Sequence, residues 1–325
     1  TPLYSSAASD VYKRQIKSIL HVVQPVSIKF WLVIGSLLLT AVQLFVSPIS
    51  QTFSLFFLAT TLFFFGLPHG ALDHQVEARY SKKAKLSFAH FSKSYVLKIL
   101  ITCIIWLISP SVGLVSFLLF SGYHFGETDL RSPEFGLNPK GVIITFYGLG
   151  ILGCLLLPRI TEVWLIVEWI SPVFAANKDF TSAISANNLA LWSCFFLLVS
   201  LISGYLFSKS NAKLSVKVRL FIPALLLLIL YPLPSLTAFT FYFGLWHSLH
   251  ALMHIRKHLG CSLPGLVRIA LPCSIISTVG LVVFIVFIIM KDWSPVLMTM
   301  VFISALTTPH VGVMMRMYDK GQLSN

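Results

Sequence analysis

The stretch LVRIALPCSIISTVGLVVFIVFIIM (266–290) decides the fold class, because it is almost wholly apolar and its only charged residue is Arg268. About 20 such residues cross a hydrocarbon core of roughly 30 Å as one helix. The whole chain has this character. Of its 325 residues, 56% are hydrophobic and 11% are charged, against roughly 45–50% and 25% in soluble domains. This composition excludes a soluble globular protein, a disordered chain and a disulfide scaffold.

Similar apolar runs recur along the chain and predict an all-α fold, a polytopic transmembrane helix bundle of about ten spans. The predicted spans are residues 28–47, 51–69, 95–109, 111–125, 141–158, 188–208, 216–233, 236–255, 266–290 and 295–316. A further apolar patch, residues 162–175, is interrupted by Glu162, Glu168 and Pro172. We interpret this patch as interfacial or re-entrant.

The basic residues predict an orientation for the bundle. The formal net charge is +13. With ten spans, only Arg159, Lys178 and Lys291 lie on one side, and the other Lys and Arg residues lie on the opposite side. Basic loops stay in the cytoplasm, so both termini are expected there. We expect a multi-pass protein of a bacterial inner (plasma) membrane. Orientation explains the positive charge, so we expect no nucleic-acid partner.

Histidines are concentrated in four of the predicted spans. The segments are FFFGLPHGALDH (63–74), SGYHFGETD (121–129), FYFGLWHSLHALMH (241–254) and LTTPHVGVMMR (306–316). In the predicted topology every segment lies in the cytoplasmic half of its helix. Ionisable side chains inside a membrane are costly and mark functional sites, and neutral imidazole is a common ligand for iron, zinc and copper. The pattern therefore predicts one shared metal site.

Spacing narrows the choice within the third segment. His247 and His250 are neighbours on one helix face, and so are His250 and His254. His247 and His254 are about two turns apart, which is too far for one metal. We favour His247 with His250, leave His254 and His310 as alternatives, and expect nearby carboxylates to hold the imidazole rings. These carboxylates belong to Asp73, Glu127 and Asp129.

Together, the segments LPHGALDH (67–74), YHFGETD (123–129), YFGLWHSLHALMH (242–254) and TTPHVGVMM (307–315) resemble the Brp/Blh-type β-carotene 15,15′-dioxygenase family. The resemblance implies an integral membrane enzyme that cleaves β-carotene with O2 at its central double bond. The expected product is two molecules of all-trans-retinal, often made for a microbial rhodopsin. It also implies non-haem Fe(II) as the cofactor.

The resemblance places iron ligands at His69, His124 and His247. The family pattern H-S-x-x-H would put a further histidine at position 251, where this chain has Ala251. The fourth ligand therefore stays open between His250 and the alternatives His254 and His310. Aromatic side chains beside the ligands are expected to line the polyene site. They are Tyr123, Phe125, Phe243 and Trp246.

Two other functions stay open as alternatives. A di-iron membrane desaturase or hydroxylase would need about eight histidines in tight boxes, and only His250 and His254 approach that spacing. A metal- or proton-coupled transporter would be expected to show inverted repeats. Residues 1–15 fit none of these patterns and are predicted to be a non-native leader, so residues 16–325 are predicted to form a single integral membrane catalytic domain.

Overall fold

The computed structural model describes residues 28–80, 87–131, 141–159, 191, 194–195, 198, 201–202, 221–290 and 295–321. In these ranges all regular structure is helical and no strand occurs. The all-α prediction is confirmed to this extent. The predicted leader 1–15 and the patch 162–175 lie outside the described residues, as does most of the predicted span 188–208.

The chain divides into two compact units, Thr1–Pro48 and Ile49–Asn325. The described part of the first unit is one apolar helix, Ile28–Val46, that is long enough to cross a membrane. Its last turn is the π-helix η1, Val42–Val46. Inside this helix the Ser36 hydroxyl donates to the backbone carbonyl of Val33, which satisfies a polar group that lipid could not.

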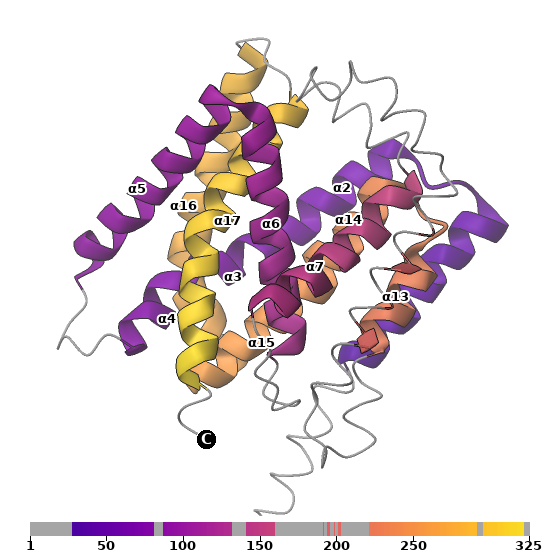
Figure 1. The fold of residues 1–325 in the computed structure, drawn as a ribbon, viewed down its shortest axis with the longest axis horizontal. Coiled ribbons are helices and arrows are strands. Elements are labelled where there is room, and N and C mark those ends of the chain that lie inside the picture. Colours follow the sequence, from indigo (N-terminus) through magenta and orange to yellow (C-terminus); the bar gives the residue numbers. More distant parts are fainter. Residues whose placement is uncertain are drawn as a thin grey trace, which may run out of the picture. The chain divides into compact units, whose positions relative to one another are not determined.

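The second unit contains the remaining helices, and its histidine-bearing segments fall on several of them (Figure 1). Its elements are α2 (Gln51–Thr61), η2 (Leu62–Gly66), α3 (Leu67–Ala71), α4 (Asp73–Tyr80), α5 (Phe88–Ile108), α6 (Pro110–Leu130), α7 (Gly141–Leu156), η3 (Leu157–Arg159), α13 (Ile222–Leu230), α14 (Ser235–Thr240), η4 (Phe241–His247), α15 (Ser248–Leu259), α16 (Leu263–Met290) and α17 (Pro295–Gly321).

Side-chain caps and proline set where two of these helices begin. Ser50 accepts a hydrogen bond from the backbone N–H of Phe53 at the start of α2. Ser109 ends α5 and caps α6 by accepting from Val112. Pro110 follows in the first turn of α6, where a missing N–H costs nothing.

Four described helices are long and apolar enough to cross a membrane: Ile28–Val46, Gln51–Arg79, Phe88–Ile108 and Leu263–Val286. They correspond to four predicted spans. Gly141–Leu156 is a shorter apolar helix. The chain is therefore a helical protein with several candidate membrane spans, and the count of ten and the sides of the termini stay predictions.

Helices α6 and α7 lie in direct backbone contact. A Cβ added at Gly126 would collide with the carbonyl oxygen of Ile144, and one added at Gly148 would collide with that of Gly122. Small residues four apart allow such close approach in membrane helices. The contact fixes α6, which carries His124, against its neighbour.

Helix α17 contacts α4, α5 and α6, and Figure 1 shows it running between α5 and α6. A buried apolar cluster joins its second half to α4, α15 and α16. The central members of this cluster are Val76, Ala251, Ile255, Val313 and Met314. The cluster packs this half of α17 against its neighbours, and His310 in the middle of α17 contacts His69 of α3 and His124 of α6.

Candidate metal centre

Four imidazole rings from four separate segments meet inside the second unit. His69 lies on α3, His124 on α6, His247 at the end of η4 and His310 on α17, and each is at most 6% exposed. The ligand nitrogens of His69, His124 and His247 all lie within 4.8 Å of one another. The His310 ring lies edge-on against two of these rings, with centroid distances of 4.9 Å to His69 and 4.7 Å to His124.

Irregular helical turns precede two of these histidines. His69 follows the π-helical turn η2 by three residues, and His247 is the last residue of the π-helix η4. π-Turns are rare and occur frequently at functional sites. The segments η2 and η4 pack against each other, and Gly244 of η4 lies directly against the side chain of Thr61. This contact brings the His69 and His247 rings to a centroid distance of 5.7 Å.

Hydrogen bonds set the protonated nitrogen of two rings. The Nδ1–H of His69 donates to the carbonyl oxygen of Phe65 at 3.3 Å. The Nδ1–H of His310 donates to Oδ1 of Asp73 at 2.7 Å. Because carbonyl and carboxylate oxygens only accept, Nδ1 carries a proton in both rings, and in a neutral ring Nε2 is then the nitrogen with the free lone pair. Nε2 of His310 is buried and has no hydrogen-bond partner within the described ranges.

The other two rings approach each other through the nitrogens that a metal would bind. Nε2 of His124 and Nε2 of His247 are 3.0 Å apart. Two ligands at right angles on one metal, with metal–nitrogen bonds of about 2.1 Å, would be separated by about 3 Å. This spacing fits His69, His124 and His247 to one divalent metal. Nε2 of His310 has no partner among the described residues and its ring lies against two of these rings, so it is the candidate fourth donor.

His250, His254 and His310 all lie outside the group of three whose ligand atoms lie within 4.8 Å of one another. Of these, His310 is the one whose ring lies against two members of the group. The His250 ring packs on Trp246 at 4.5 Å, and its Nδ1–H donates to the Trp246 carbonyl oxygen at 2.9 Å. His254 shares a 2.7 Å hydrogen bond with the Tyr318 hydroxyl. The structure therefore brings His310, rather than His250, beside the three other histidines.

One of the three predicted carboxylates holds a ring of this group. Asp73 follows His69 by four residues, but its carboxylate binds His310. Oδ2 of Asp73 accepts a second hydrogen bond, from the hydroxyl of Tyr95 at 2.9 Å. Tyr95 thus belongs to the site through Asp73. No sequence motif indicates this role, since Tyr95 lies on α5, which carries none of the four clustered histidines.

The other two carboxylates bind aromatic and cationic side chains. Glu127 accepts from the Tyr123 hydroxyl and from Arg131, both at 3.1 Å. Asp129 accepts from the Tyr242 hydroxyl at 3.0 Å and from the Trp246 indole N–H at 3.4 Å. Asp129 therefore ties α6 to η4, the segment that ends at His247. Its partner Tyr242 was also missed, although it lies within the third histidine-bearing segment.

Two of the four predicted lining aromatics lie directly on the centre. The Phe125 ring is 4.7 Å from that of His247, and the Phe243 ring stacks on His247 at 6.0 Å with an interplanar angle of 8°. The other two donate hydrogen bonds to carboxylates: the Tyr123 hydroxyl to Glu127, and the Trp246 indole N–H to Asp129. The face of His247 is therefore apolar.

Comparison with known protein families agrees with this geometry. The family model described as beta-carotene 15,15'-dioxygenase matches residues 60–318. The chain belongs to this family. No curated protein and no solved structure matches it.

The region matched to the β-carotene dioxygenase family begins just before η2 and ends within α17. It includes the four clustered histidines, Asp73 and Tyr95. The resemblance inferred from the four histidine segments is thereby confirmed. Family membership indicates an oxygenase that acts on β-carotene, and it covers the whole of the candidate metal centre.

Proposed function

We propose that this chain is a β-carotene 15,15′-dioxygenase. It cleaves the central double bond of β-carotene with O2 and yields two molecules of all-trans-retinal. The observation that carries the proposal is the meeting of four buried imidazole rings inside the region that matches the family. The cofactor in this proposal is non-haem Fe(II).

His69, His124, His247 and His310 are the proposed iron ligands. His310 takes the place that spacing along the third segment assigned to His250, because its Nε2 is unpartnered among described residues and its ring contacts two other ligands. Asp73 fixes the His310 tautomer and increases the basicity of the ring. Four neutral ligands leave the positive charge of the metal undiminished.

Iron held by these histidines would supply the activation of O2. The protein contributes a dry and apolar setting for this chemistry. Phe125 and Phe243 lie against His247, where they can pack on a polyene chain. Their ring faces also stabilise positive charge that develops on the substrate. We assign Tyr123 and Trp246 to the outer wall of the same site.

The substrate reaches the site from lipid, because β-carotene is a hydrocarbon that dissolves in the bilayer and not in water. Residues 16–325 would then form one integral catalytic domain with about ten spans and both termini in the cytoplasm of a bacterial cell. Retinal made there would serve a microbial rhodopsin in the same membrane.

A reconstitution experiment tests the proposal. Purified protein is loaded anaerobically with Fe(II), mixed with β-carotene in detergent micelles and exposed to air, and the products are separated by chromatography. We expect two retinals for each β-carotene consumed, and none from protein loaded with Zn(II). Products of unequal length would contradict central cleavage. Iron-loaded protein that leaves β-carotene intact would contradict the proposed reaction.

A further inference from the structure

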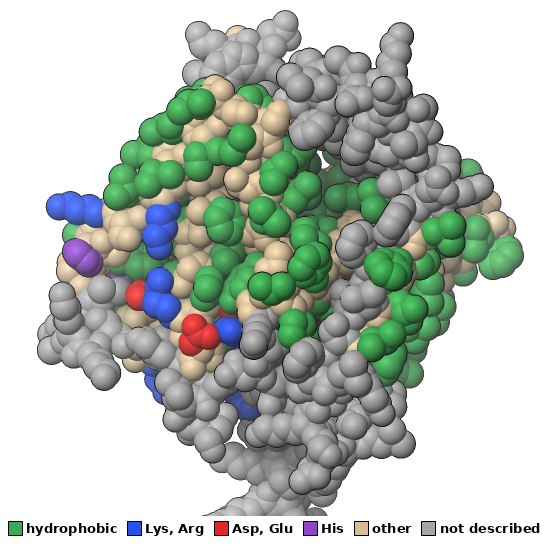
Figure 2. Space-filling view, in the orientation of Figure 1, with side chains coloured by type: hydrophobic (Ala, Val, Ile, Leu, Met, Phe, Trp, Pro, Cys, Tyr) green, Lys and Arg blue, Asp and Glu red, His purple; other side chains and the backbone are tan. Residues whose placement is uncertain are grey.

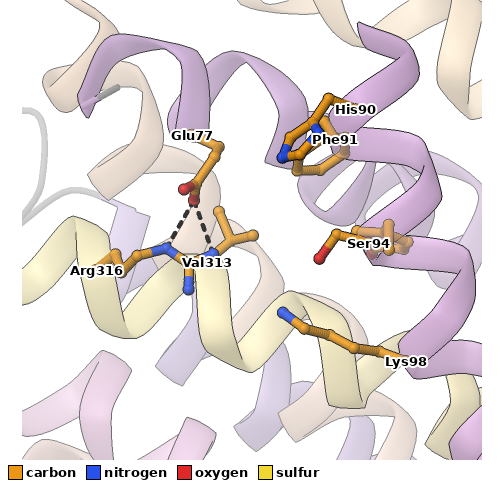
Figure 3. Close-up of a pocket in the computed structure, with 8 residues that line it drawn as sticks. Glu77, His90, Phe91, Ser94, Lys98, Val313 and Arg316 are labelled. Atoms are coloured by element: carbon orange, nitrogen blue, oxygen red, sulfur yellow. Dashed lines mark hydrogen bonds and ion pairs between the residues drawn. The ribbon is translucent and has the colours of Figure 1, made fainter. Parts of the chain in front are cut away.

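A polar cavity of about 140 Å³ lies between α4, α5 and α17, and none of the clustered histidines lines it. Figure 3 shows its residues from α5 facing Glu77 of α4 and Arg316 of α17. The polar side chains that line it are those of Glu77, His90, Ser94, Tyr95, Lys98 and Arg316. Such a concentration of polar groups is unexpected on α5, which is apolar enough to span a membrane.

Three of these residues share one face of α5. His90, Ser94 and Lys98 are spaced by four residues, so their side chains lie one above another. None of the three side chains forms a hydrogen bond or an ion pair with a residue in the described ranges. Helix α5 therefore presents three polar side chains to the cavity, and none of them is bound to another described residue.

Arg316 completes the cavity with a donor of fixed position. Its Nε and Nη2 both bind Oε2 of Glu77 at 2.8 Å, which neutralises Glu77 and orients the guanidinium group. Nη1 is left over. A Cβ added at Gly312 would lie 3.6 Å from Nζ of Lys98 and 3.8 Å from Nη1 of Arg316. Two cationic nitrogens thus approach one point that Gly312 keeps open.

The charges at this point do not balance. Glu77 offsets Arg316, and Lys98 is half-buried with no described acidic partner. An ammonium group on an apolar helix is costly unless an anion or water compensates it. A tetrahedral anion with several acceptor oxygens matches the converging Lys98, Arg316 and Ser94 donors.

The surroundings indicate where such an anion comes from. Val96, Leu97, Leu100 and Ile101 of α5 are about half exposed, at 49–57%, and they present hydrocarbon beside the cavity. In Figure 2, blue Lys and Arg side chains and a purple His gather over the half of α5 nearest α4, and green hydrophobic side chains cover the other half. A phospholipid can place its acyl chains along the green surface and its phosphate in the cavity.

We propose that this cavity binds the phosphate group of an anionic phospholipid. Nζ of Lys98 and Nη1 of Arg316 contact the phosphate oxygens, and the Ser94 hydroxyl donates to one of them. Basic pockets between membrane helices bind anionic headgroups in this way. None of the clustered histidines lines this cavity, which shares only Tyr95 with the surroundings of the metal centre, and the proposal does not depend on the activity proposed above.

Native mass spectrometry of the purified full chain in detergent tests the site, with phosphatidylglycerol and phosphatidylcholine as the probes. We expect phosphatidylglycerol to be preferred. Lys98→Gln should weaken its binding about fivefold, since one basic residue near a membrane surface contributes about 1 kcal/mol. Lys93→Gln is the matched control, because Lys93 is an exposed lysine on the same helix that does not line the cavity.

A second variant keeps every charge and fills the space instead. In Gly312→Ala the new methyl group lies at ordinary contact distance from both nitrogens, so the helix is retained and the phosphate position is occupied. This variant should also lose the preference for phosphatidylglycerol. Its thermal unfolding midpoint reports that the protein is folded.

Soluble phosphate distinguishes the source of the ligand. If inorganic phosphate or glycerol 3-phosphate displaces phosphatidylglycerol at millimolar concentration, the cavity binds free phosphate as well as the lipid. If neither competes, it binds the lipid alone. Two results would overturn the proposal: equal binding of phosphatidylglycerol and phosphatidylcholine, or an equal effect of Lys98→Gln and Lys93→Gln.

Discussion

The Asp73 carboxylate and the His310 imidazole lie 237 residues apart in the sequence, and they form a 2.7 Å hydrogen bond between Oδ1 and Nδ1. The carboxylate can only accept, so it holds a proton on Nδ1, and in the neutral ring this leaves the lone pair of His310 on Nε2. Both side chains are nearly buried, at 2% and 4% exposure. The pair therefore fixes the orientation of one proposed ligand in a buried setting.

Removal of this carboxylate should weaken metal binding. Loss of a carboxylate that orients a ligating histidine typically costs about 10- to 100-fold in metal affinity. We expect Asp73→Ala to lower iron affinity in this range, measured as iron per chain at a series of buffered Fe(II) concentrations. Asp73→Asn, which keeps an acceptor oxygen, should lose less.

Tyr95→Phe removes the hydrogen bond that the Tyr95 hydroxyl donates to the Asp73 carboxylate, and it leaves the carboxylate itself in place. The hydroxyl of Tyr95 donates to Oδ2 of Asp73, and one hydrogen bond contributes about 1 kcal/mol, or about fivefold in affinity. A loss of iron affinity as large as that of Asp73→Ala would show that Tyr95 itself, and not Asp73, sets the position of His310.

The identity of the fourth ligand is decided by two alanine variants. His310→Ala should lose bound iron together with retinal formation, as should His69→Ala, His124→Ala and His247→Ala. His250→Ala should keep its iron, because its ring packs on Trp246. Iron retained in His310→Ala and lost in His250→Ala would reverse the assignment.

The sequence could predict three of the four clustered histidines, because His69, His124 and His247 each lie in a local motif. It ranked His310 below His250 because helical spacing shows which side chains share a face and does not show which face meets another helix. The contact between His310 and Asp73 joins segments at opposite ends of the chain. No local pattern contains it.

The positions of the long helices could also be predicted from the sequence, but their irregular turns and mutual contacts could not. Apolar runs located the long helices, since hydrophobic length is a property of one segment. The π-turns η2 and η4 were missed, because an extra residue per turn leaves composition unchanged. The contact between α6 and α7 was also invisible beforehand. Gly122 and Gly126 lie on α6, but their spacing does not show which helix packs there, and the structure places Gly148 of α7 against them.

Gly148→Ala should destabilise the protein through this contact. A Cβ there collides with the Gly122 carbonyl oxygen, so the helices must separate. Overpacking of this kind costs about 1–3 kcal/mol. We expect a lower thermal unfolding midpoint in detergent and reduced iron occupancy, because α6 carries His124.

Gly280→Ala is the control for helix propensity. No atom lies within 4 Å of an added Cβ at Gly280 in the described ranges, so this substitution in α16 should leave the midpoint unchanged or raise it. Equal destabilisation by both variants would mean that close approach of α6 and α7 is not the cause.

Phe243→Leu tests the apolar face of His247. Phe243 stacks on His247, whereas Phe239, one turn earlier, stacks on Phe243 at 5.4 Å. Aromatic contacts contribute about 0.5–1.5 kcal/mol beyond their buried area, so Phe243→Leu should lower kcat/KM for β-carotene about three- to tenfold. Iron occupancy should not change, because no ligand is removed. Phe239→Leu should have a smaller effect, since its ring is one contact further from the metal centre. If the two variants lose activity equally, Phe243 acts through the helix and not on the polyene.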